Sequence, residues 1–100
     1  MIVIAGTIRI PEEHREQILD CLVRLQKNSF ENDEGIVAFR FGIDLEHEDL
    51  LHVYEEWEST EVLKAHMQKP HMDEFRNLKN ELQLETSGFS RWRAEELGQF

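Results

Sequence analysis

The sequence predicts an α+β fold in which four antiparallel strands form one sheet and two helices cover one of its faces. Stretches of alternating apolar residues, typical of strands, occur at residues 2–10, 36–44, 50–57 and 84–93. Apolar residues spaced three or four positions apart, typical of helices, lie between the first two strands and between the last two. The resulting order, β-α-β-β-α-β, is the split βαβ or ferredoxin-like arrangement.

Length and charge limit the class of protein. We expect a single domain over residues 1–100, with a core at about 2–93 and a polar tail at 94–100. The net charge is −10, from 21 acidic and 11 basic residues, so neither nucleic acid nor an anionic membrane is an expected partner. The lone Cys21 allows no internal disulfide, and no apolar run suits a membrane span or signal peptide. We therefore expect a cytoplasmic protein.

The first strand and helix follow from residue types before position 35. Gly6 interrupts a β-branched strand, so we expect it to admit the close approach of another group. Pro11 suits the first turn of a helix, which is predicted to run to about Asn28, ahead of a polar loop over 28–35. The apolar stripe of this helix is His14, Ile18, Cys21, Leu22 and Leu25, widened by Leu19 and Val23.

The second and third strands are joined by a polar connection at 45–49, where His47 is interpreted as solvated and not as a metal ligand. Strand alternation separates the side chains of each strand onto two faces. In the second strand, one face is expected to hold Val37, Phe39, Phe41 and Ile43, and the other Ala38, Arg40 and Gly42. In the third strand, one face is expected to hold Leu51, Val53, Glu55 and Trp57, and the other Leu50, His52, Tyr54 and Glu56.

The second helix is predicted to begin after Ser59, a suitable N-cap, and to break near Lys69 because of Pro70. Its inward stripe is expected to be Val62, Leu63, His66 and Met67, continued beyond the break by Phe75, Leu78 and Leu82. The apolar sheet residues are too numerous for the helix-covered face alone; they include Phe39, Phe41, Tyr54 and Trp92. An uncovered apolar face typically marks an interface, so we predict a homodimer packed sheet on sheet with twofold symmetry.

Four stretches of the chain resemble the antibiotic biosynthesis monooxygenase (ABM) domain proteins. They are IVIAG at 2–6, DEG at 33–35, YEEWES at 54–59 and AHMQKPHM at 65–72, within a resemblance that covers about 2–93. The resemblance implies a dimeric α+β barrel with a pocket between the sheet and the helices of each subunit. It also implies one of several activities. Some members oxygenate phenols or quinols without metal or flavin, others degrade haem, and others act on small signalling molecules.

Individual positions distinguish these branches. The polyketide-oxygenating branch has an Asn and a Tyr where this chain has Val53 and Leu63. The haem-degrading branch has a Trp and a His where this chain has His66 and Arg76. The pair His66 and His71 looks most like the quinol monooxygenase branch, although the signal-molecule branch also has it.

Oxygenation without a cofactor requires a base, a dry pocket and donors that hold a substrate anion. The candidate catalytic bases are His66 and His71, because imidazole titrates near neutral pH. The candidate substrate-binding walls are Trp57, Phe39, Phe41 and Met67. Arg40 or Arg91 could stabilise an oxyanion if either points inward. No metal or other cofactor is expected, because two histidines five apart around a proline lack the helical spacing of metal ligands.

Three functions remain open from the sequence. The first is a cofactor-independent monooxygenase that acts on a quinol or phenol with O₂. The second is a non-catalytic, stress-associated dimer that binds a small ligand. The third is an isomerase of a small hydroxylated signal molecule. Each site residue also has a structural alternative: His66 and Trp57 as core residues, and His71 as a corner of the chain.

Overall fold

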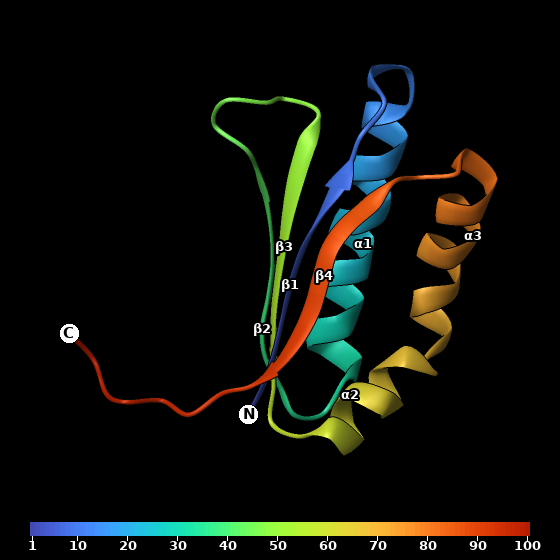
Figure 1. Cartoon of the computed structure of the whole chain (residues 1–100). Coiled ribbons are helices and arrows are strands. Elements are labelled where there is room, and N and C mark those ends of the chain that lie inside the picture. The colour runs from blue at the N-terminus through green and yellow to red at the C-terminus, as the bar shows by residue number, and fades with distance from the viewer.

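The computed structural model, which describes residues 1–100, contains one antiparallel sheet with helices on a single face (Figure 1). The strands are β1 (Ile2–Arg9), β2 (Ile36–Ile43), β3 (Leu50–Trp57) and β4 (Thr86–Arg93), in the order β2-β3-β1-β4. The helices are α1 (Arg15–Asn32), α2 (Thr60–Met67) and α3 (Asp73–Leu82), with 3₁₀ turns η1 (Glu12–His14) and η2 (Pro70–Met72). The predicted α+β, ferredoxin-like fold is confirmed, with the second helical region divided at Pro70.

The core lies between the sheet and α1, and the strand register decides which residues reach it. The face toward the helices is made of Ile2, Ile4, Gly6 and Ile8 of β1, Ile36, Phe39, Phe41 and Ile43 of β2, and Leu51, Val53, Glu55 and Trp57 of β3. Opposite them, α1 contributes Ile18, Cys21, Leu22 and Leu25. Of the four apolar sheet residues that the sequence judged too numerous for one face, Phe39 and Phe41 lie on the helix-covered face and Tyr54 and Trp92 lie on the outer face.

The first helix is longer than the sequence predicted. It continues to Asn32, past the expected end at Asn28, and the side chain of Asn32 donates a hydrogen bond to the Asn28 carbonyl at 2.9 Å. Ser29 in this extra turn is fully buried. Val23, expected beside the stripe, is exposed, because one residue beyond Leu22 the helix has already turned toward solvent.

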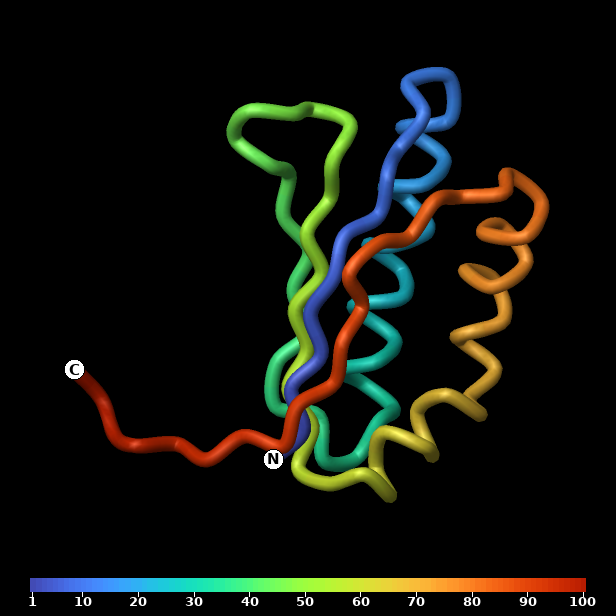
Figure 2. Tube along the Cα trace, in the orientation of Figure 1, coloured from blue at the N-terminus to red at the C-terminus, as the bar shows by residue number.

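Two strands also differ from the prediction at their ends. A bulge in the pairing of β2 with β3, between Ile36 and Ala38, removes Val37 from the face of Phe39 and leaves Val37 exposed. β4 begins at Thr86, and Leu84 is a buried residue of the preceding connection. Figure 2 shows the chain after β4 leading away from the sheet toward residue 100. None of the helices combines the length and apolar character that a membrane crossing requires.

Gly6 is the point of close approach that the sequence predicted. A Cβ atom at Gly6 would lie 2.5 Å from the Phe89 ring and 2.9 Å from the Phe89 Cα. Because backbone cannot move aside as a flexible side chain can, we expect Gly6→Ala to destabilise the fold by about 1–3 kcal/mol in urea denaturation. Gly42→Ala is the matched control, because a Cβ there meets nothing within 4 Å. Equal stability of the two variants would contradict this packing.

Candidate active site

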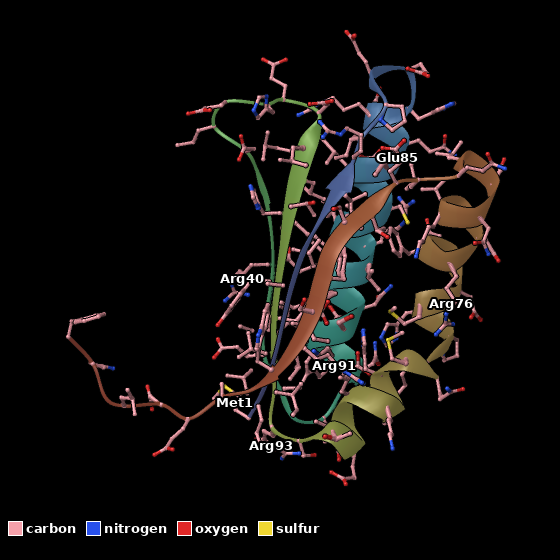
Figure 3. All side chains as sticks on the ribbon, in the orientation of Figure 1. Met1, Arg40, Arg76, Glu85, Arg91 and Arg93 are labelled. Carbon is pink, nitrogen blue, oxygen red and sulfur yellow. The ribbon has the colours of Figure 1, made fainter.

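A cavity of about 330 Å³ lies between the sheet and the helices. Its wall is mostly apolar and is formed by Ile4, Ile8, Leu22, Leu25, Phe39, Phe41, Val53, Met67, Met72, Phe75 and Phe89. The remaining lining residues are Glu55, His66, Lys79 and Thr86. A mainly apolar cavity of this size with a few polar groups is typical of a site for a small molecule. Figure 3 shows the side chains that fill the space between the sheet and the helices around it.

His66 reaches the cavity from α2. The Ser59 hydroxyl caps this helix by accepting a hydrogen bond from the Val62 backbone N–H at 3.3 Å. The His66 side chain is 1% exposed, and its Nδ1 lies 2.7 Å from Asp33 Oδ2. Its Nε2 makes no hydrogen bond but keeps some exposed surface. His66 lines the cavity, and Nε2 is the ring nitrogen left free to meet a ligand there, because Nδ1 is occupied by Asp33.

Asp33 joins the two histidines that the sequence singled out. It follows α1, where its backbone N–H donates to the Ser29 carbonyl at 2.9 Å. A single oxygen, Oδ2, contacts both His66 Nδ1 and His71 Nε2, the latter at 2.8 Å. Asp33 belongs to the DEG stretch at 33–35, but sequence reasoning gave it no role because 33 residues separate it from His66.

These contacts assign the protons on the His66 ring. A carboxylate oxygen only accepts, so both imidazoles donate to Asp33, and the His66 proton sits on Nδ1. Burial lowers the pKa of His66, although its hydrogen bond to Asp33 opposes that effect. His66 is therefore a neutral imidazole at pH 7, with the lone pair of Nε2 toward the cavity. This is the state that a general base requires.

His71 lies in η2, is nearly buried, and does not line the cavity. It serves as the second hydrogen-bond donor to Asp33. Asp33, His66 and His71 together are a set of side chains of the kind that bind metals, with their ligand atoms within 4.8 Å of one another. However, the N–O separations of 2.7 and 2.8 Å are hydrogen-bond distances, whereas ligands around a tetrahedral ion lie about 3.3 Å apart. The expectation of no metal stays a prediction.

Trp57 lies behind His66 and is not part of the cavity wall. Its side chain is fully buried, and its ring centroid is 4.4 Å from that of His66. The indole Nε1 donates a hydrogen bond to Glu55 Oε1 at 2.9 Å. Trp57 thus fixes the positions of two cavity groups, a role different from the substrate wall that the sequence suggested.

Glu55 is an acidic residue of the cavity wall that was not predicted from the sequence as a site residue. It is 9% exposed, and burial raises its pKa to about 7, although the hydrogen bond from Trp57 opposes the rise. The sequence contained one sign of this role. Glu55 shares a strand face with Leu51, Val53 and Trp57, and a glutamate at a core-facing position is unusual unless it is paired.

The other predicted wall residues do line the cavity. Phe39 and Phe41 pack edge to face with ring centroids 5.1 Å apart, and Phe39 also meets the His66 ring at 5.7 Å. Met67 lines the cavity from a partly exposed position. Neither arginine reaches it. Arg40 is on the outer face of the edge strand β2, and its guanidinium lies over the Phe30 ring of α1, outside the cavity wall. Arg91 is on the helix side but also outside the cavity wall (Figure 3).

The fold and the cavity define an α+β domain with a candidate small-molecule site. The family model for antibiotic biosynthesis monooxygenase matches residues 1–78, so the chain belongs to this family. No curated protein matches the chain.

Solved structures share its fold. One is a candidate antibiotic biosynthesis monooxygenase from Deinococcus radiodurans, with 17% identity, 100% of this chain and 98% of that chain covered, and a TM-score of 0.88. A second is a protein of unknown function from Bacteroides thetaiotaomicron, named as a possible oxidoreductase, with 24% identity, 91% and 94% covered, and a TM-score of 0.80. A third is a conserved protein from Methanosarcina mazei, with 22% identity, 94% and 92% covered, and a TM-score of 0.79. At these identities the similarity shows the fold alone.

Proposed function

We propose that this protein is a cofactor-independent monooxygenase that oxidises a quinol or related phenol with O₂ in the cavity between the sheet and the helices. The observation that carries the proposal is His66, a buried neutral imidazole held by Asp33 through Nδ1, with Nε2 toward an apolar cavity. Membership of the monooxygenase family supports oxygen chemistry. The aromatic side chains of Phe39 and Phe41 on the β2 wall of the cavity suit a flat substrate.

The first step is removal of a hydroxyl proton from the substrate by His66 Nε2. The resulting anion is electron-rich enough to pass one electron to O₂, which is why neither metal nor flavin is needed. Asp33 stabilises the imidazolium that forms, and His71 keeps Asp33 in position. Met67 and the phenylalanines exclude water, which strengthens these charge interactions.

The proposal includes a homodimer in the cytoplasm. On the sheet face away from the helices, the Tyr54 and Trp92 side chains are 40% and 51% exposed. Val37 in the β2 bulge is exposed as well. Burial of such a face against a second copy would remove apolar surface from water. Sedimentation equilibrium at micromolar concentration is expected to give twice the 11.9 kDa of one chain. A mass of one chain would contradict the dimer.

The test of the proposed function is a screen of hydroquinones and phenols in chelator-treated buffer, run with and without O₂. We expect turnover only with O₂, above the rate of spontaneous oxidation. Turnover without O₂ would favour the isomerase of a hydroxylated signal molecule. A ligand-dependent rise in melting temperature without turnover would favour the non-catalytic, stress-associated binding protein. Either result would overturn the monooxygenase proposal.

A further inference from the structure

We propose that Glu55 is a second catalytic residue of this cavity, which gives a proton to the peroxide formed on the substrate and then takes the substrate's C–H proton. The inference rests on the proposed function, because it concerns a later step of the same reaction. It assigns an acid–base role to a residue outside the Asp33, His66 and His71 cluster. His66 begins the reaction, and Glu55 completes it.

The geometry places Glu55 and His66 on different walls of one cavity. Glu55 comes from the sheet, where its neighbours in the register are Ile4 of β1 and Phe39 of β2, and His66 comes from α2. Glu55 Oε1 accepts the Trp57 indole N–H at 2.9 Å, which orients the carboxyl group. Oε2 makes no hydrogen bond and keeps some exposed surface, and Glu55 lines the cavity, so Oε2 is the oxygen left free to meet a ligand there. A bound ring would therefore meet a proton-transfer atom from each wall.

The surroundings of Glu55 keep its carboxyl group protonated near neutral pH. Three basic or titratable side chains lie on the elements packed around Glu55: His66 of α2, Lys79 of α3 and Arg91 of β4. None of them forms an ion pair or hydrogen bond with Glu55. α1 presents only Leu22 and Leu25 to the cavity. Burial without a charged partner raises the pKa of Glu55 to about 7, so a large share carries the proton that a general acid needs.

The step balances for a hydroquinone. His66 takes one hydroxyl proton, the anion reduces O₂ to superoxide by one electron, and the two radicals join in a C–O bond beside the ring oxygen. Glu55 donates its proton to the terminal oxygen of this peroxide. The Glu55 carboxylate then takes the proton from the same ring carbon while the O–O bond breaks, forming a new carbonyl and releasing hydroxide. The hydroxide takes the proton from His66, so one O₂ yields a hydroxyquinone and one water, and both residues regain their starting states.

Glu55→Gln tests the inference, because it keeps the size of the side chain and an acceptor for the Trp57 N–H but cannot transfer a proton. We expect kcat for a hydroquinone to fall about 100-fold or more while KM changes less than about threefold. In the wild type, kcat should decline as pH rises past about 7, where Glu55 loses its proton. That decline should be absent in Glu55→Gln. The matched control is Glu56→Gln, since Glu56 is the adjacent residue on the opposite sheet face.

A second variant covers the case in which Glu55→Gln fails to fold. The Trp57 hydrogen bond lowers the pKa of Glu55, so Trp57→Phe should move the decline in kcat to higher pH. A decline in kcat at the same pH as in the wild type, or at a lower pH, would overturn the inference. So would a Glu55→Gln enzyme with the kcat and pH profile of the wild type, and in that case the monooxygenase function would stand. Absence of O₂-dependent turnover in the wild type would instead overturn the proposed function and this role with it.

Discussion

Glu55→Gln is expected to make the protein more stable than the wild type at pH 8, by about 3 kcal/mol. Burial raises the pKa of Glu55 from an ordinary 4.5 to about 7 in the folded protein. The unfolded chain therefore ionises first as pH rises, and the folded chain loses stability between about pH 4.5 and 7. The difference of about 2.5 pKa units corresponds to about 3 kcal/mol, and glutamine avoids it because it never ionises.

Urea denaturation from pH 4 to pH 8 measures this effect. Wild type and Glu55→Gln should have similar free energies of unfolding at pH 4 and should diverge as pH rises from about 4.5 to 7. The control is Glu56→Gln, which makes the same chemical change at the adjacent residue on the opposite sheet face. Curves for Glu55→Gln and wild type that stay parallel over the whole range would show that Glu55 is not buried as an acid. The expected gain in stability with loss of activity is the usual trade-off at a functional site.

His66→Ala is expected to lower kcat by about 10²–10⁴-fold, because general-base catalysis contributes on that scale. His71→Ala should cost less, since His71 contacts Asp33 and not the cavity. Asp33→Asn should also lower kcat, because an amide can donate to His66 Nδ1 and so place the ring proton on Nε2. A larger fall in kcat for His66→Ala than for His71→Ala distinguishes the general base from a residue that only holds Asp33 in position.

The matched control for His66→Ala is His52→Ala. His52 is a histidine on the opposite sheet face, half exposed, and paired with Asp44 at 2.8 Å. It should keep the kcat of the wild type, and circular dichroism should show both variants folded. In the wild type, kcat should rise with pH only below about 6.5, because burial lowers the pKa of His66 from that value. Equal losses in His52→Ala and His66→Ala would remove His66 from the mechanism.

The sequence predicted the fold well because strand and helix periodicities are local properties. Alternation in β3 identified the face that holds Val53, Glu55 and Trp57, and Pro70 marked the division of the second helix. Errors arose where tertiary packing outweighs local pattern. The end of α1 contains polar residues, yet Ser29 is fully buried there, and the bulge at Val37 shifts one residue of β2 out of register.

The candidate site was predicted only in part, for a related reason. His66, Phe39, Phe41 and Met67 were found because each lies on a recognisable inward stripe. Asp33 was missed because its partners lie far along the chain, and a lone aspartate after a helix resembles any loop residue.

Glu55 was missed for a different reason. Its importance depends on burial without a charged partner, which no spacing in the sequence reveals. Trp57 and His71 do lie next to the cavity residues, but only the structure shows that they contact His66 and Asp33 and do not face the cavity.

The most direct test of the central claim is an oxygen-electrode trace of the wild type with a hydroquinone substrate in metal-free buffer, followed by addition of catalase. A monooxygenase incorporates one oxygen atom and releases the other as water. We therefore expect one O₂ to be consumed per hydroquinone, no O₂ to be returned by catalase, and O₂ uptake at the background rate in His66→Ala. Return of half the O₂ would reveal hydrogen peroxide and a simple oxidase, and wild-type uptake at the background rate would contradict the oxygenase itself.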